Sequence, residues 1–293
     1  MVMQPDIARR VGALIGERTP FVVATVVRAQ RPTSVRPGDS GIVLGDGTIE
    51  GFVGGACAET SVRLQALRAL ETGEALLLRI VPDGDETAEA EGAMVVENPC
   101  LSGGALEIFL EPRLPAPRIA VVGNTPIAHA LASIGERAGY EVETSEDLSD
   151  SIALVVASHG RDEEDALTAA LTAAVPYVGL VASRKRGAAV KEELRMRGMA
   201  EEELNRVHTP AGLDIGAQTA EEIAISILAE IVATRHRQIR GPETATDPVC
   251  GMSVAVSSSS PSTQHDAQTI YFCGDGCRKA FEADPARYAA PLG

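Results

Sequence analysis

The stretch AVVGNTPIAHALASIGERAGYEVET, residues 120–144, decides the fold of the middle of this chain. Its apolar start is typical of a buried strand, the residues after Gly123 have helical spacing, and a second apolar stretch follows. Further strand and helix patterns alternate up to about residue 236. This order predicts parallel strands joined by helices, a Rossmann-like doubly wound α/β domain over residues 115–240.

The turn after the first of these strands departs from the glycine pattern of dinucleotide-binding sites. Gly123 supplies the first glycine, but Thr125 stands where a second glycine would let a pyrophosphate approach. His159 follows another predicted strand, at the edge where such sheets bind ligands, although it is equally suited to capping the next helix. We therefore treat Gly123 and His159 as candidate ligand contacts and regard NAD as a doubtful cofactor.

Residues 1–114 have a different pattern, which predicts an α+β domain. A β-branched stretch over 21–29 indicates a strand, and Asp46–Gly47 between two apolar stretches indicates a tight hairpin. Helical spacing begins at Cys57 and stops at Gly73. The proline-rich sequence EPRLPAPR then separates this domain from the next.

Composition limits the classes of partner and compartment. The 293 residues include 26 Lys and Arg against 41 Asp and Glu, a formal charge of −15 that opposes binding to nucleic acid and to anionic membranes. The sequence has neither a long apolar span nor a secretory signal pattern, so we expect a cytoplasmic protein. Five cysteines, an odd number in a reducing compartment, favour thiolate chemistry or metal binding over disulfides.

One cysteine stands at a glycine-rich corner, GFVGGACAET, residues 51–60. Gly54 and Gly55 allow the backbone to approach a bulky ligand, and the start of a helix favours the thiolate form of Cys57. Glu59 is positioned to orient a ligand, and Cys100 lies in a second glycine-rich turn. From the residues alone, Cys57 is a packed core thiol, a nucleophile or a soft ligand for a metal.

A catalytic role for Cys57 lacks a partner base in its own domain. The five histidines are His129, His159, His208, His236 and His265, all outside residues 1–114. A cysteine nucleophile needs such a base close by. We therefore assign no catalytic residue and expect a protein that binds its ligand without turnover.

Several blocks in order resemble the xanthine dehydrogenase accessory family, of the XdhC/CoxI type, over about residues 10–237. They are ATVVRAQRPTSVRPGDSGIVLGDGTIEGFVGGACAE, CLSGGALEIFLEP, SHGRDEEDAL and HTPAGLDIGAQTAEEIAISILAEI. In this resemblance Cys57 falls on the cysteine of the family's Gly-Gly-Cys motif, with Ala56 where a third glycine is often found. Arg36 falls on the arginine of the Ser-Pro-Arg block, where it can pair with a phosphate.

The resemblance implies a chaperone that binds molybdenum cofactor, shields it during sulfuration and delivers it to an apo-molybdenum hydroxylase. Thiophilic molybdenum and the phosphate of the pterin suit a thiolate in a turn rich in N–H groups. The implied partners are the apo-hydroxylase and a cysteine desulfurase, and we expect a homo-oligomer. The alternatives are an NAD(P)-dependent oxidoreductase and a protein that stores or senses metal through its C-terminal segment.

The C-terminal segment, 247–293, resembles a YHS domain through DPVCGM and HDAQTIYFCGDGCRKAFEADPARY. It is too small to be stabilised by an apolar core alone, so a bound metal is expected. Cys250, Cys273 and Cys277 are the predicted ligands, and His265 is a candidate fourth ligand. Three sulfurs suit Cu(I), or Zn with one further ligand.

Overall fold

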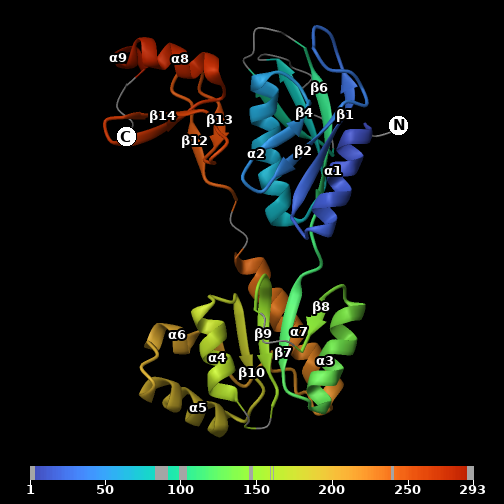
Figure 1. The fold of residues 1–293 in the computed structure, drawn as a ribbon, viewed down its shortest axis with the longest axis vertical. Helices are drawn as coiled ribbons and strands as arrows, with labels where there is room; N and C mark the ends of the chain where they lie inside the picture. The colour runs from blue at the N-terminus through green and yellow to red at the C-terminus, as the bar shows by residue number, and fades with distance from the viewer. Residues whose placement is uncertain are drawn as a thin grey trace. The chain divides into compact units, whose positions relative to one another are not determined.

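The chain folds into two compact units, Met1–Pro115 with Arg240–Gly293, and Ala116–Ile239 (Figure 1). The computed structural model describes residues 4–82, 92–98, 104–144, 148–158, 160, 162–238 and 241–288. The C-terminal segment, which the sequence predicts as a third domain, belongs to the same compact unit as the N-terminal residues.

The first unit is built on a six-stranded sheet in the order β3-β2-β1-β6-β4-β5. Its strands are antiparallel except for the parallel pair β4–β5. The predicted hairpin is confirmed, because β2 and β3 pair on either side of the Asp46–Gly47 turn. The strands are β1 (Phe21–Ala29), β2 (Ser40–Leu44), β3 (Ile49–Gly51), β4 (Leu76–Pro82), β5 (Met94–Asn98) and β6 (Leu106–Arg113).

Two helices cover opposite faces of this sheet. Because side chains alternate along β1, Val22 and Ala24 pack in the cluster that includes α2 (Ala56–Thr72), whereas Phe21 and Val23 pack with α1 (Pro5–Gly16). Helix α2 ends at Gly73, whose φ of 74° is left-handed, as the sequence predicts. The sheet therefore has an apolar core on each face.

The C-terminal segment consists of two small hairpins and two short helices. Their bounds are β12 (Thr244–Thr246), β13 (Ser253–Ala255), β14 (Ser262–His265), β15 (Gln268–Tyr271), α8 (Asp275–Ala283) and α9 (Pro285–Tyr288). Ile270, Phe272 and Phe281 form one small apolar cluster, and β13 contacts α2. A core of this size provides little stability by itself.

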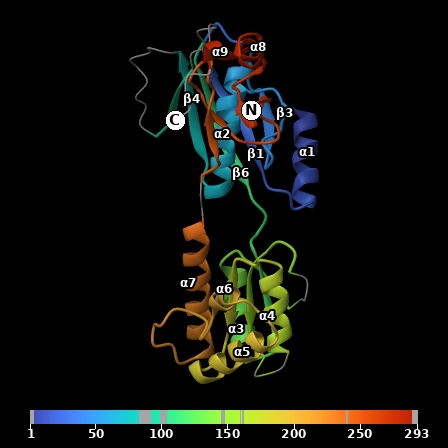
Figure 2. The same ribbon diagram turned by 90° about the vertical axis from the view of Figure 1, so that its left-hand side faces the viewer.

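The second unit has the predicted doubly wound architecture (Figure 2). Five strands lie in the parallel order β11-β10-β9-β7-β8, with α4, α5 and α6 packed on one face and α3 and α7 on the other. The elements are β7 (Arg118–Val122), α3 (Pro126–Arg137), β8 (Glu141–Glu143), β9 (Ser151–Val156), α4 (Glu163–Thr172), β10 (Tyr177–Leu180), α5 (Arg184–Met196), α6 (Glu201–Asn205), β11 (Val207–His208) and α7 (Ala220–Gln238). The fold class predicted from the sequence is confirmed.

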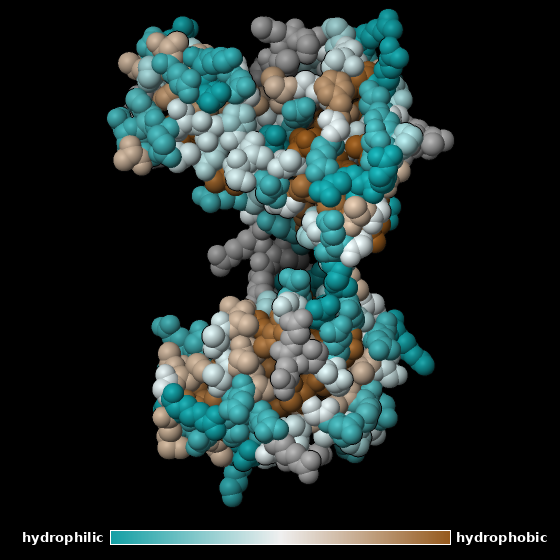
Figure 3. All heavy atoms as spheres, in the orientation of Figure 1, coloured by the Kyte–Doolittle hydropathy of each residue, from teal (hydrophilic) through white to brown (hydrophobic). Residues whose placement is uncertain are grey.

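Hydrophilic residues cover much of the face shown in Figure 3, as the charged composition predicts. Some larger apolar side chains are exposed, Ile15 and Met196 among them. Within the described part of the chain, no helix combines the length and the apolar character needed to cross a bilayer.

Candidate functional site

A glycine turn joins β3 to α2 and places Cys57 in the first turn of the helix. Gly55 is the N-cap residue, and among the described side chains none caps this helix. Cys57 is half-buried, so the apolar core does not enclose it. The N–H groups at a helix start carry a partial positive charge that attracts anions. The predicted corner therefore combines a thiol with an electropositive helix end.

The two glycines of this turn have different roles. Gly54 is buried with φ at 148°, and a Cβ there would lie 2.7 Å from the Cβ of Ala58. Gly55 is exposed in ordinary extended backbone, and a Cβ there would meet no atom within 4 Å among the described residues. Close packing of the turn on α2 therefore requires glycine at position 54 only.

Two other residues predicted for this corner, Glu59 and Arg36, lie on α2 and in the β1–β2 loop. Glu59 is half-buried on α2, one helical turn before Arg63, whose Nε donates to the Gly47 carbonyl at 2.8 Å. Arg36 is exposed in the β1–β2 loop, and its N–H donates to an Asp39 carboxylate oxygen at 2.8 Å. The predicted roles of Glu59 and Arg36 stay predictions.

Cys100 lies outside the described residues. The chain is described again from Gly104, where a Cβ would lie 2.1 Å from the Pro32 carbonyl oxygen.

The β1–β2 loop, which carries Arg36, packs on the core of the first unit. Val35, directly before Arg36, belongs to the apolar cluster that also contains Ala58 of α2. The β1–β2 loop is therefore anchored on the same core as the Cys57 corner.

The second candidate site is a cluster of three cysteines in the C-terminal segment. The Sγ atom of Cys273 lies 3.5 Å from Cys250 Sγ and 3.5 Å from Cys277 Sγ. A metal–sulfur bond of about 2.3 Å in tetrahedral geometry requires sulfurs about 3.8 Å apart, close to this spacing and far from the roughly 2.0 Å of a disulfide. The three predicted cysteine ligands are therefore brought together in a geometry that suits a metal ion.

Asp247 completes this cluster, and sequence reasoning missed it. Its side chain is fully buried, and ligand atoms of Asp247, Cys250, Cys273 and Cys277 all lie within 4.8 Å of one another. Its two carboxylate oxygens accept hydrogen bonds from the amides of Val249, at 2.8 Å, and Cys273, at 2.7 Å. It therefore holds the two cysteine-bearing segments together.

His265 is not part of this group. Its Nε2 lies 3.5 Å from an Asp266 carboxylate oxygen, and its ring packs edge-on against Phe281 at 5.3 Å between centroids. The structure places Asp247 where the sequence offered His265. Among the described residues, the fourth group beside the sulfurs is a carboxylate.

The third candidate site, the turn after β7, is built for close packing. Gly123 has φ at 122°, and a Cβ there would lie 2.1 Å from the Ala157 carbonyl oxygen at the end of β9. Thr125 is buried and caps α3 by accepting the Ala128 N–H at 3.2 Å, while Pro126 contributes no N–H. The start of α3 therefore has fewer N–H groups available to bind a pyrophosphate. His159, the other predicted contact, lies outside the described residues.

Comparison with protein families matches three regions of the chain. Residues 14–81 match the XdhC and CoxI family, residues 119–231 match the XdhC Rossmann domain, and residues 245–291 match the YHS domain. The chain therefore combines two XdhC-type domains with a YHS domain.

Two relatives from Escherichia coli strain K12 have sequences similar to the chain. One, named uncharacterized protein YqeB, is 27% identical over 250 residues, which cover 75% of this chain and 44% of YqeB. The other, named molybdenum cofactor insertion chaperone PaoD, is 24% identical over 268 residues, covering 74% of this chain and 84% of PaoD. The chain thus spans less than half the length of YqeB.

A solved structure from Bacillus halodurans, described as a xanthine dehydrogenase, also matches. It is 16% identical with a TM-score of 0.37, and the match covers 80% of this chain and 97% of that chain.

Gly54 and Gly55, neighbours in the XdhC and CoxI domain, allow a direct test of how closely the turn packs on α2. Gly54→Ala should lower the free energy of unfolding by about 2 kcal/mol or more, because alanine is strained at this φ and its Cβ meets Ala58. Gly55→Ala should cost less than about 1 kcal/mol, mainly through a poorer N-cap. Urea unfolding of both variants measures the difference, and equal costs would contradict the proposed packing of the turn.

Two cysteines of the YHS domain, Cys273 and Cys277, carry raised thiol pKa values. Burial raises the pKa of Cys277 to about 12, with the nearby Asp247 carboxylate adding to the effect. Burial also raises the pKa of Cys273, helped by its contacts with Cys277 and Asp247. For Asp247, burial alone would raise the pKa, but hydrogen bonds from the Cys273 and Val249 amides lower it below its usual value. The cluster therefore places one carboxylate beside two thiols held in their protonated form, which a soft cation would convert to thiolates.

Metal binding to the YHS domain should release about three protons near pH 7, one from each cysteine. The raised thiol pKa values imply that protons compete with the metal, so the apparent affinity should fall as the pH is lowered. Titration with Zn²⁺ in a weakly buffered solution containing a pH indicator counts the released protons. Release of fewer than about two would mean that the three cysteines do not bind the ion together.

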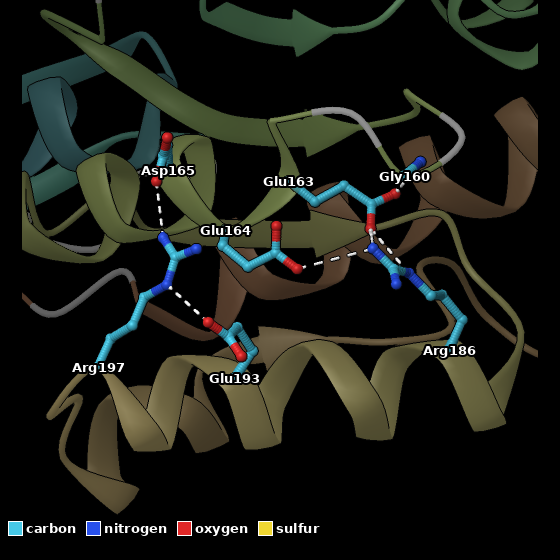
Figure 4. Close-up of polar contacts among 7 residues, drawn as sticks. All are labelled: Gly160, Glu163, Glu164, Asp165, Arg186, Glu193 and Arg197. Carbon is cyan, nitrogen blue, oxygen red and sulfur yellow. Dashed lines mark hydrogen bonds and ion pairs between the residues drawn. The ribbon is translucent and has the colours of Figure 1, made fainter.

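A buried glutamate, Glu163, joins two segments of the XdhC Rossmann domain. Figure 4 shows Glu163 between the β9–α4 loop and α5. One carboxylate oxygen accepts the Gly160 N–H at 2.7 Å, and the other accepts Arg186 Nη2 at 2.8 Å. Sequence reasoning missed Glu163 because an acidic residue in the first turn of a helix is ordinary.

His208, which the sequence analysis left without a role, belongs to a polar network. Its Nδ1 lies 2.9 Å from Glu230 Oε1, while Glu230 Oε2 accepts the Tyr177 hydroxyl and the Gly212 N–H, both at 2.7 Å. Burial raises the pKa of Glu230, but these three hydrogen bonds outweigh it, and the net pKa is lowered. The network fixes the loop that follows β11.

Replacing Glu230 by glutamine should cost about 1–2 kcal/mol of unfolding free energy at pH 7. The folded-state pKa of Glu230 is lowered, so its contribution is present above its unfolded pKa and is lost as the pH falls through the folded value. The difference between wild type and Glu230→Gln should therefore shrink at pH 3.5. Urea midpoints at the two pH values test this, and a difference that grows in acid would contradict it.

Proposed function

We propose that this protein is a maturation chaperone that binds molybdenum cofactor as cargo and passes it to an apo-molybdenum hydroxylase. The two XdhC-type domains support this proposal, as does the similarity to PaoD, a protein named as a molybdenum cofactor insertion chaperone. The single observation that carries it is the Cys57 corner, where a half-buried thiol lies in the first turn of α2.

The chemistry of the cargo fits this corner. Molybdenum is thiophilic, so the Cys57 sulfur is a suitable ligand for it. The phosphate of the pterin suits the N–H groups of the α2 start and the exposed guanidinium of Arg36. Gly54 keeps the turn close to α2, and the half-buried Glu59 lies one turn from Arg63 on the same helix. Cys57 thus holds the metal while N–H groups hold the phosphate.

The finer steps of this role are further parts of the proposal. The bound cofactor is shielded while a cysteine desulfurase supplies the terminal sulfido ligand, and the chain acts as a homo-oligomer in the cytoplasm. Cys100 and His159, which lie outside the described residues, are kept as candidate ligand contacts, each within its own domain. The YHS domain binds Zn or Cu through Cys250, Cys273 and Cys277 and couples metal handling to maturation.

The runner-up, an NAD(P)-dependent oxidoreductase, has less support. Thr125 already caps α3, and Pro126 contributes no N–H at its first position. A metal store acting through the YHS domain is the second candidate, favoured by the 3.5 Å spacing of the sulfurs. A metal store would keep its metal-binding capacity in a Cys57→Ser variant, whereas the chaperone would lose its ability to activate a hydroxylase.

A transfer assay tests the proposal. Protein purified from cells that make the cofactor is mixed with an apo-hydroxylase, and the hydroxylase activity is followed. In a parallel assay, the purified protein alone is tested for NAD(H) turnover. We expect activation of the hydroxylase without NAD(H) turnover by the chaperone itself. A preparation that carries no pterin and activates nothing would contradict the proposal. Deletion of residues 247–293 tests the coupling, which fails if metal content and activation both stay unchanged.

A further inference from the structure

A cavity of about 440 Å³ lies between α2, β5 and the turn after Cys250, within the first compact unit. Its volume falls within the range of about 300–1,000 Å³ found for small-molecule sites. Cys250 and Met252 line it from the YHS domain, Arg68 lines it from α2, and Glu97 lines it from β5. The cavity therefore borders the candidate metal centre through one of the three cysteines.

A tetrahedral metal ion held by the three cysteines would need one further ligand. Both oxygens of Asp247 already accept backbone N–H groups, so the carboxylate is better suited to orienting the cysteines than to serving as a full ligand. Three sulfurs then remain as protein ligands. Zinc sites with three protein ligands keep a fourth position for an exchangeable group.

Contacts between α2 and the YHS domain hold the two walls of the cavity together. The Thr60 hydroxyl donates to the carbonyl of Cys273, and a Cβ on Gly274 would lie 3.2 Å from the Cβ of Ala56. A further contact joins the YHS domain to the β2–β3 turn, where the hydroxyl of Ser259 donates to the Asp46 carbonyl at 3.1 Å. The cysteine-bearing segment is thus seated directly on the first turns of α2.

Two opposite charges line the cavity without neutralising each other. Arg68 is half-buried and donates to Gln65 Oε1 at 3.4 Å, and Gln65 itself is only 4% exposed. Among the described residues, no ion pair within 4.0 Å joins Arg68 to Glu97. The cavity therefore offers a cation, an anion and, through Cys250, one ligand of the candidate metal centre.

We propose that this cavity binds a small thiol that carries both a carboxylate and an ammonium group, the chemistry of free cysteine and of short cysteine peptides. Its carboxylate pairs with Arg68 and its ammonium with Glu97. Its sulfur would be a further thiolate ligand for a metal held by Cys250, Cys273 and Cys277, with the thiol proton passing to water. The inference rests on the metal centre proposed above.

Cobalt-substituted full-length protein provides the test, because Co²⁺ bound to thiolates has visible bands that change with the ligand set. The protein is loaded with one equivalent of Co²⁺ without oxygen and titrated with four thiols. L-cysteine carries both charges, 3-mercaptopropionate only the carboxylate, cysteamine only the ammonium, and 2-mercaptoethanol neither. We expect L-cysteine to bind tightest, with each missing charge weakening binding about tenfold. Glutathione distinguishes a peptide from the free amino acid as the ligand.

Two variants test which side chain binds which charged group of the thiol. Arg68→Gln should remove the advantage of thiols with a carboxylate, and Glu97→Gln the advantage of thiols with an ammonium group. Arg9→Gln, on an exposed arginine of α1, changes the net charge by the same amount as Arg68→Gln and should behave as wild type. Ser253→Trp places a large side chain on the exposed rim of the cavity and should weaken the binding of all four thiols. Because the chain contains no other tryptophan, the fluorescence of this residue reports on the cavity alone.

The outcomes separate this inference from the metal centre itself. Cobalt bands that no thiol alters, or equal affinities for all four thiols, would overturn the inference while leaving the metal centre intact. Unchanged preferences in Arg68→Gln and Glu97→Gln would also overturn it. A protein without sulfur-to-cobalt bands before any thiol is added would overturn both. Cobalt content after desalting shows whether a thiol has bound or has stripped the metal.

Discussion

Replacing Cys273 by serine should remove the metal of the YHS domain almost completely. The Cys273 sulfur lies 3.5 Å from both other cysteine sulfurs, so it is the shared member of the group. Serine offers no thiolate, and loss of a ligand should weaken binding by more than the 10–100-fold typical of outer-shell changes, that is, at least about 100-fold. Metal content after dialysis against a chelator should fall from about one ion per chain to near zero.

Matched variants distinguish a lost ligand from a lost fold. His265→Ala should keep the metal, because its ring packs against Phe281 and not among the sulfurs. Asp247→Asn should weaken binding about 10–100-fold, because it removes the charge that orients Cys273. Metal retained in Cys273→Ser but lost in His265→Ala would refute the assigned ligand set.

Replacing Cys57 by serine should strip the protein of molybdenum and pterin. The thiol is the soft donor of the α2 corner, and a neutral hydroxyl is a poor ligand for a thiophilic metal. Loss of a metal–sulfur bond should reduce retention of the cofactor at least about tenfold on gel filtration. The serine variant keeps the shape of the corner, because Gly54 and Ala58 are unchanged, so the fold should be preserved.

Most of the fold follows from local patterns in the sequence. The β-branched stretch 21–29 is β1, the helix after the glycine turn is α2, and the capping box of Thr219 and Glu222 opens α7 with reciprocal hydrogen bonds of 3.1 and 3.2 Å. Each of these depends on neighbours within a few positions. Helix α1 was not predicted, although Pro5 at its start and the helical spacing of Ile7, Val11 and Leu14 are local signals of the same kind.

The candidate sites were predicted less completely, because they depend on contacts between distant residues. Cysteine spacing predicts the sulfur cluster, but nothing local shows that the Asp247 carboxylate accepts the amide of Cys273, 26 residues away. His265 was chosen by residue type, and tertiary packing places it beside Phe281. Arg68 and Glu97 could not be predicted as site residues, because each is an ordinary charge on a helix or a strand and only the fold places both in one cavity.

The central claim is that Cys57 holds molybdenum cofactor, separately from the metal of the YHS domain. Its most direct test is the molybdenum, pterin, zinc and copper content of wild type, Cys57→Ser and Cys273→Ser purified side by side. We predict that Cys57→Ser loses molybdenum and pterin but keeps the YHS metal, and that Cys273→Ser shows the reverse. Wild-type levels of molybdenum and pterin in Cys57→Ser would contradict the claim.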